Sequence, residues 1–186
     1  STAQQTGPFW HFQTGEPSRN DTWAKIGIDG DYVYVGFRCA EAEMAKLKVG
    51  KLPLDSMSLF ANDHIELFLM PDALGTTYYH FSVDVAGNRH DELGNGGDWT
   101  CDWQAAVNLA GDSWTVEMRL PRKAIGLTDP QMSLANFCRT RRLEPAETSA
   151  WSTTFGLFHN PSRFGRLVYG PTSGIDFAAL TLRQPK

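Results

Sequence analysis

The sequence predicts an all-β protein, a single antiparallel β-sandwich with one or two short helices. Three observations predict this class. Apolar residues recur with a period of two along most of the chain, and Gly, Asp and Asn separate the alternating runs. Apolar residues make up 41% of the 186 residues, which is enough for a packed core. This length suits one domain, and we take residues 1–186 as that domain.

Two hairpins are the clearest elements. Trp23 to Ile28 alternates into the turn Asp29-Gly30-Asp31, and Tyr32 to Cys39 then places its apolar residues on one face. Ser113 to Leu120 follows the turn residues Ala110-Gly111-Asp112 with the same alternation. Further strands are predicted at His64 to Met70, Tyr78 to Val85, Trp103 to Leu109, Leu134 to Arg141, Arg166 to Tyr169 and Phe177 to Leu182.

Two short segments are predicted to be helical, Ala40 to Leu47 and Pro121 to Leu127. Proline is well suited to the first turn of a helix, as it would be in the second segment. Trp23, Trp103 and Trp114 lie on or next to the apolar phase of strands, so we expect all three in the core.

The charge balance excludes one class of partner. The chain has 17 Lys and Arg against 21 Asp and Glu, a net charge of −4, so no basic field is available to neutralise nucleic-acid phosphates. No run approaches the roughly eighteen apolar residues of a membrane span, and no membrane partner is expected. The three cysteines, Cys39, Cys101 and Cys138, show no CxxC spacing and fit neither a zinc site nor a disulfide framework, although their number allows one bridge.

Three aromatic residues lie in polar or small company outside the strands: Phe60, Trp99 and Trp151. An exposed ring can stack on the C–H face of a pyranose while carboxylate, amide and imidazole groups bond the hydroxyls. The alternative is that these rings fold back on the ends of the sandwich.

The chain also resembles the family-nine carbohydrate-binding modules and their relatives with a DOMON-like sandwich. The resemblance covers about Trp23 to Gly170 and depends on the order of its segments. These segments are Asp29-Gly30-Asp31-Tyr32-Val33-Tyr34-Val35-Gly36-Phe37, Asn62-Asp63-His64-Ile65-Glu66-Leu67-Phe68-Leu69, Tyr78-Tyr79-His80-Phe81-Ser82-Val83-Asp84, Trp114-Thr115-Val116-Glu117-Met118-Arg119-Leu120-Pro121, Asn136-Phe137-Cys138-Arg139, Ala150-Trp151-Ser152 and Pro161-Ser162-Arg163-Phe164-Gly165.

The resemblance implies a non-catalytic module that binds an oligo- or polysaccharide such as xylan. It implies secretion or a cell-surface location, attachment to a polysaccharide-degrading catalytic domain, and frequently a structural calcium ion, with no haem. Phe60 and Trp151 match the two rings that hold the sugar in the family. Glu66 matches an acid that binds sugar hydroxyls, and His80 falls near a position where relatives use arginine. Trp99 is a further candidate ring. The acidic turns at Asp29/Asp31 and Asp55/Asp63 are generic calcium candidates.

Three other interpretations are open. DOMON-like sandwiches include haem-binding electron-transfer domains, and Met57, Met70, His64 and His159 offer axial-ligand atoms. A glycoside hydrolase could pair Asp63 or Glu66 with Glu117, although GxSxG, HExxH and P-loop signatures are absent. The third interpretation is a sandwich with a purely structural role in a longer enzyme.

Overall fold

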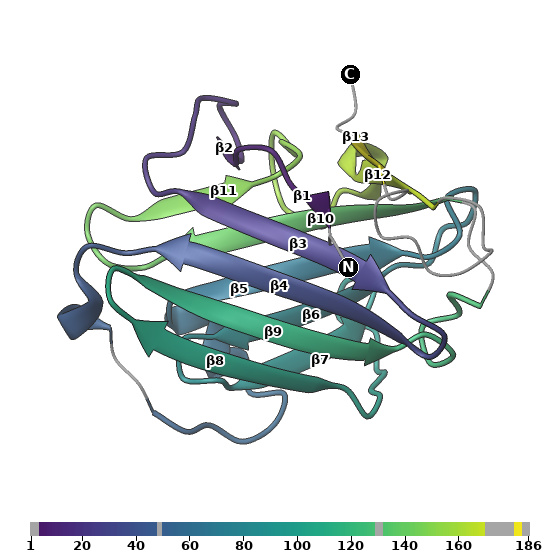
Figure 1. Ribbon diagram of the computed structural model, residues 1–186, viewed down its shortest axis with the longest axis horizontal. Coiled ribbons are helices and arrows are strands. Elements are labelled where there is room, and N and C mark those ends of the chain that lie inside the picture. Colours follow the sequence, from purple (N-terminus) through teal and green to yellow (C-terminus); the bar gives the residue numbers. More distant parts are fainter. Residues whose placement is uncertain (1–3, 48–49, 129–131, 170–180, 184–186) are drawn as a thin grey trace.

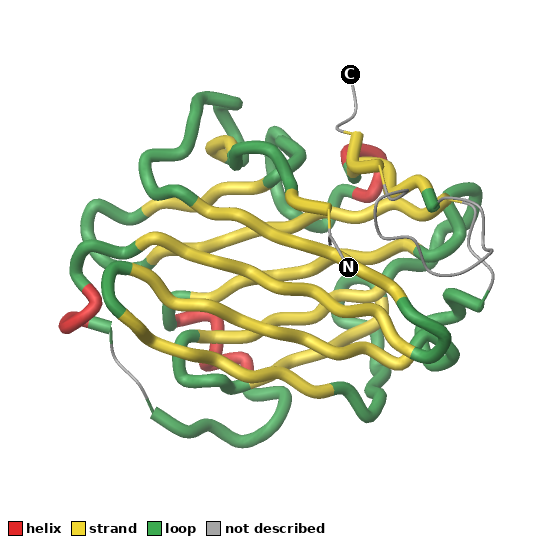
Figure 2. Tube along the Cα trace, in the orientation of Figure 1, coloured by secondary structure: helices red, strands yellow, loops and turns green. Residues whose placement is uncertain are grey.

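The computed structural model describes residues 4–47, 50–128, 132–169 and 181–183. Its two antiparallel sheets face each other as the layers of a sandwich (Figure 1), and β-structure dominates the tube trace (Figure 2). The predicted all-β sandwich is therefore confirmed. Among the described residues, no helix is both long enough and apolar enough to cross a lipid bilayer.

One sheet has five strands among the described residues, in the order β1-β3-β4-β9-β8. Their bounds are β1 Gln4–Gln5, β3 Thr22–Ile28, β4 Tyr32–Ala40, β8 Gln104–Ala110 and β9 Ser113–Pro121. Both predicted hairpins lie here, because β3 pairs with β4 and β8 pairs with β9 in antiparallel register.

The second sheet has the order β13-β12-β10-β5-β6-β7, and β11 joins β2 to β10. Its strands are β2 Trp10–His11, β5 His64–Met70, β6 Tyr79–Asp84, β7 Arg89–Leu93, β10 Met132–Arg141, β11 Glu147–Ala150, β12 Gly165–Val168 and β13 Thr181–Arg183. The predicted strand Phe177 to Leu182 falls largely on residues 170–180, which lie outside the described residues.

The inward phase of each sheet builds the core. On β4 the residues Val33, Val35 and Phe37 are at most 3% exposed, and on β5 Ile65 and Leu67 are fully buried. β5 is buried on both faces along its whole length, so its outward residues are also shielded from solvent. Because β5 lies in the middle of the second sheet, a second layer of side chains can be organised on its outward face.

Neither predicted helix forms over its predicted range. Residues 40–47 contain only the 3-10 turn η1 (Met44–Lys46), because Ala40 is the last residue of β4. Residues 121–127 form turns after β9, in which the Arg122 side chain donates to the carbonyls of Leu127 and Asp29 at 2.9 and 2.7 Å. The carbonyls are therefore satisfied without a helical ladder.

Two further 3-10 turns lie between strands, η2 (Met57–Ala61) and η3 (Pro161–Arg163). The core prediction holds for Trp103 and Trp114, which are 2% and 0% exposed. It is wrong for Trp23, which lies on the outward phase of β3 and is only half-buried, with the Arg38 guanidinium 5.2 Å from its ring centroid.

Candidate functional site

Titratable side chains gather on the face of β5, β6 and β7 that points away from the sandwich interior. Strand register explains the gathering. Phe68 on β5 is opposite His80 on β6, and His80 is in turn opposite Glu92 on β7. Glu66 lies two residues before Phe68, so it shares this face with His80 across the diagonal. We call the set His64, Glu66, His80, His90, Glu92 and His159 the histidine–glutamate cluster.

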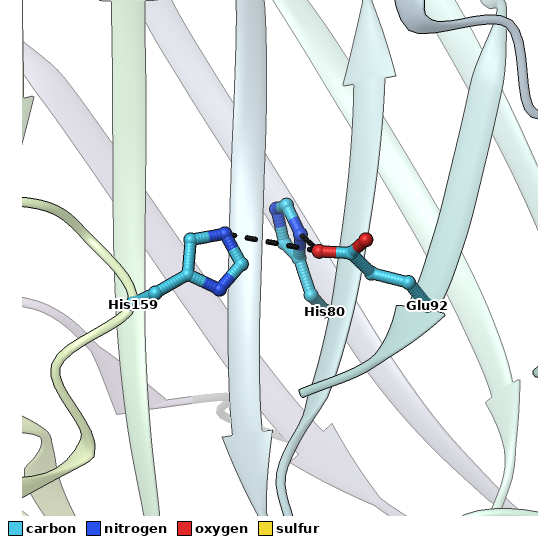
Figure 3. Close-up of side chains that lie close together, drawn as sticks. All are labelled: His80, Glu92 and His159. Atoms are coloured by element: carbon cyan, nitrogen blue, oxygen red, sulfur yellow. Dashed lines mark hydrogen bonds and ion pairs between the residues drawn. The ribbon is translucent and has the colours of Figure 1, made fainter. Parts of the chain in front are cut away.

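Short polar contacts link the cluster. His80 bridges two carboxylates, with Nε2 2.7 Å from Glu66 Oε2 and Nδ1 2.9 Å from Glu92 Oε1. The second oxygen of Glu66 is 3.3 Å from His64 Nε2. Glu92 Oε1 also lies 3.7 Å from His159 Nε2, which is contributed by the loop after β11 (Figure 3).

Contacts within the cluster shift the pKa values of its members. Burial disfavours the charged form of Glu66, but hydrogen bonds from His64 and His80 outweigh burial and hold the pKa of Glu66 below the ordinary value. Burial would also lower the pKa of His80, yet its hydrogen bonds to Glu66 and Glu92 raise that pKa overall. For His159, burial and the nearby charge of His80 lower the pKa. The pKa of His80 is therefore raised by its two carboxylate partners, and that of His159 is lowered.

Phe60 lies over this cluster. It belongs to η2, which is held from below by the fully buried Leu59 and from the side by Arg142, whose Nε donates to the Phe60 carbonyl at 3.0 Å. The Phe60 ring is stacked toward His80 with ring centroids 6.1 Å apart. It meets the rings of His64 and His90 edge-on at 5.3 and 5.5 Å.

Phe68 supports His80 from the sheet, since their rings are stacked 4.3 Å apart with an angle of 6° between their planes. Phe68 belongs to a smaller apolar cluster outside the main core. The other buried members of that cluster are Met70, Tyr78, Cys138, Ala150, Phe158 and Phe164. His80 is therefore locked in place, whereas Phe60, Glu92 and His159 form the less buried rim.

The structure brings three of the five predicted site residues together: Phe60, Glu66 and His80. The exposed placement expected of Trp151 is wrong. Trp151 is 2% exposed, its backbone N–H donates to the Phe137 carbonyl at 2.8 Å, and its ring meets that of Phe137 edge-on at 5.7 Å within the main core. Trp99 packs at the border of that core against Tyr79, with ring centroids 4.6 Å apart, and does not join the others.

Sequence reasoning missed two members of the cluster, His90 and Glu92, and named His64 and His159 only as haem-ligand candidates. His90 and Glu92 alternate on β7, so recognition of that strand would have placed both on one face. His159 carries no local signal, because the fold of the loop before η3 brings it to Glu92.

The structure separates the residues of the proposed carboxylate pair, and it places the two methionine candidates for haem apart from each other. Glu117 lies at an exposed position of β9 in the opposite sheet, so the sandwich core separates it from Glu66 and the proposed carboxylate pair is wrong. Among the suggested haem ligands, Met57 is 67% exposed on η2, whereas Met70 is buried in the smaller apolar cluster.

The carboxylates of the acidic turns accept hydrogen bonds in this structure. Asp29 uses Oδ1 to accept from the backbone N–H groups of Asp31 and Tyr32, and Oδ2 to accept from the Tyr34 hydroxyl. Asp55 and Asp63 accept backbone N–H bonds from different segments, at Asp91 and Arg142 respectively. Calcium requires six to eight oxygen ligands around one point, and calcium binding stays a prediction.

Comparison with solved structures identifies proteins of the same fold. No family model and no curated protein sequence matches the chain. A family 9 carbohydrate-binding module (CBM9) from Caldicellulosiruptor kristjanssonii, solved with cellotriose, has a TM-score of 0.67 and 13% identity over 94% of this chain and 87% of that chain. This chain has the CBM9 fold. A CBM9 structure from the same organism with glucose has a TM-score of 0.65 and 16% identity, covering 90% of this chain and 87% of that one.

A third similar structure is a Bacteroides uniformis protein provisionally named as carbohydrate-binding. Its TM-score is 0.74 and its identity 18%, covering 90% of this chain and 87% of that one. The CBM9 fold is thus kept at low sequence identity.

Proposed function

We propose that this chain is a non-catalytic carbohydrate-binding module whose sugar site is the rim of the histidine–glutamate cluster under Phe60. One observation carries the proposal: an incompletely buried aromatic ring lies beside ionised and imidazole side chains on one sheet face. Such a combination of an apolar plane and fixed polar groups is typical of small-ligand sites. Three structures of the same fold, two of them solved with glucose or cellotriose, support the ligand class.

The proposed contacts follow from burial. The Phe60 ring stacks on the sugar, and the side chains of Glu92 and His159, 13% and 20% exposed, bond its hydroxyls. Glu66 and His80, 6% and 1% exposed, orient Glu92 through the hydrogen bonds of His80. Affinity is modest, because each hydroxyl contact replaces a contact with water.

The proposal extends to context. The saccharide is a plant glycan such as xylan or cellulose, and the module acts as an attachment of a secreted or cell-surface polysaccharide-degrading enzyme. The two CBM9 structures with bound sugars support a glycan partner, and the separation of Glu117 from Glu66 supports a role without bond cleavage.

Isothermal titration with glucose, cellotriose and soluble xylan tests the site. We expect Phe60→Ala to weaken binding about tenfold, or about 1.4 kcal/mol. Leu109→Ala is the matched control, since Leu109 is 43% exposed on β8 of the opposite sheet. Unchanged affinity in Phe60→Ala overturns the site, and failure of the wild-type protein to bind any of a glycan panel overturns the function.

A further inference from the structure

Three side chains of the cluster converge on one point from separate elements. His80 comes from β6, Glu92 from β7 and His159 from the loop before η3 (Figure 3). Their ligand atoms all lie within 4.8 Å of one another. His80 Nδ1 and His159 Nε2 are 2.9 and 3.7 Å from the same oxygen of Glu92.

These spacings are close to those around a tetrahedral metal ion. Zinc–ligand bonds of about 2.0–2.1 Å in tetrahedral geometry separate the ligand atoms by about 3.3 Å. The distances of 2.9 and 3.7 Å to Glu92 Oε1 bracket that value, and all three ligand atoms lie within 4.8 Å of one another.

Each imidazole is also oriented through its second nitrogen. His80 Nε2 contacts the Glu66 carboxylate at 2.7 Å, and His159 Nδ1 contacts the Tyr78 hydroxyl at 3.0 Å. Metal-binding histidines typically donate their other N–H to a carboxylate or another oxygen, which fixes the tautomer and the ring orientation. Both rings thus have the partner that a metal ligand requires.

His90 gives an independent indication. It is 7% exposed, and neither of its ring nitrogens has a hydrogen-bond partner in the described part of the chain. His90 Nε2 lies 3.6 Å from the second oxygen of Glu92, and Nδ1 lies 3.8 Å from Asp55 Oδ1. A buried polar group without a partner calls for an explanation such as a missing ion, and the unpaired nitrogens adjoin the proposed ligand Glu92.

We propose that His80 Nδ1, Glu92 and His159 Nε2 bind one divalent transition-metal ion of the zinc type. Two imidazole nitrogens and one carboxylate suit zinc, cobalt or nickel, whereas calcium and magnesium prefer oxygen ligands. Three protein ligands leave a fourth position for water. The carboxylates of Glu66 and Glu92 add negative charge that favours a cation at this point.

The experiment uses protein without a polyhistidine tag, treated with a chelator and titrated with ZnCl₂, CoCl₂ or CaCl₂. We expect one zinc ion per chain by calorimetry, a visible cobalt absorption band of tetrahedral type, and no calcium binding at this site. His159→Ala and Glu92→Gln should weaken zinc binding by at least about 10- to 100-fold, the loss typical for removal of even an orienting partner.

Controls separate this cluster from other histidines. His11→Ala should leave zinc affinity unchanged, because His11 lies on β2 and is absent from the converging group. Circular dichroism of each variant checks folding, and His159, on a loop, is the substitution that least threatens the sheet. Absence of zinc and cobalt binding, or binding unaffected by both His159→Ala and Glu92→Gln, overturns the proposal. Glu92 and His159 are also the proposed hydroxyl contacts, so an ion bound here would compete with the saccharide for these two side chains. The probe is the metal alone, so loss of zinc binding and loss of saccharide binding are measured separately.

Discussion

Replacement of Trp151 by alanine distinguishes a core ring from a sugar-stacking ring. A tryptophan side chain buries about 200 Å², and at about 25 cal/mol per Å² this burial contributes about 5 kcal/mol. Measured Trp→Ala changes in cores cost about 3–5 kcal/mol. Because Trp151 is 2% exposed and packs on Phe137, we expect Trp151→Ala to lower the free energy of unfolding by about 4 kcal/mol.

The assay is urea denaturation followed by far-UV circular dichroism. A loss of about 4 kcal/mol is a large share of a total stability of about 5–15 kcal/mol, and it should lower Tm by about 10 °C for a chain of this size. Trp23→Ala is the control, because Trp23 is half-buried on the outside of β3 under Arg38. We expect it to cost about 1 kcal/mol, near the value of an exposed cation–π contact.

The result that refutes this reasoning is specific. If Trp151→Ala unfolds within about 1 kcal/mol of the wild-type protein and at the same time loses affinity for glycans, the ring is an exposed wall of a sugar site. A loss of stability with retained affinity in the folded fraction supports the core assignment.

Other predictions concern charge, thiols and catalysis. Burial opposes ionisation of Glu147, but its hydrogen bonds, including one from the Asn20 backbone N–H at 3.0 Å, lower its pKa overall. Ionised Glu147 therefore stabilises the folded protein fully above the unfolded pKa of about 4.3. This stabilisation is lost as the pH falls through the lower folded pKa. Glu147→Gln should therefore cost about 2 kcal/mol at pH 7 and converge with the wild-type protein in acid, as pH-dependent denaturation would measure. Burial raises the pKa of Cys39 and of Cys101 to about 11, and it raises that of Cys138 well above 9.0. Native protein at pH 8 should therefore react slowly with a thiol reagent, whereas unfolded protein should react rapidly at all three thiols. Rapid native labelling of a buried cysteine would contradict this. Xylan and cellulose should yield no reducing sugar, and haem addition should produce no Soret band.

Strand alternation was sufficient to predict most of the fold. β5 matches its predicted range, His64 to Met70, because its inward residues are all large and aliphatic. β7 was missed because its sequence, Arg89 to Leu93, has no apolar alternation: Asp91 takes the inward phase and accepts a hydrogen bond from Trp103 Nε1 at 2.8 Å. A polar residue satisfied by a distant partner cannot be recognised from local pattern.

The same limitation explains the mixed outcome at the site. Glu66 and His80 could be placed on one face because both lie in strands that the pattern predicts. Trp151 was misplaced because β11 (Glu147–Ala150) was not recognised. In that strand Ala150 points to the outer apolar cluster, so the next residue along the alternation, Trp151, points inward.

The aromatic ring and the polar side chains of the proposed sugar site come from different elements of the chain. Phe60 is carried by the five-residue η2 turn, which is anchored by Leu59 and by Arg142, whereas His80 and Glu92 belong to the sheet. The ring can therefore be enlarged to tyrosine or tryptophan by exchanging this short segment alone. Substitutions in this turn would then change the ligand preference without altering the strands of the sheet.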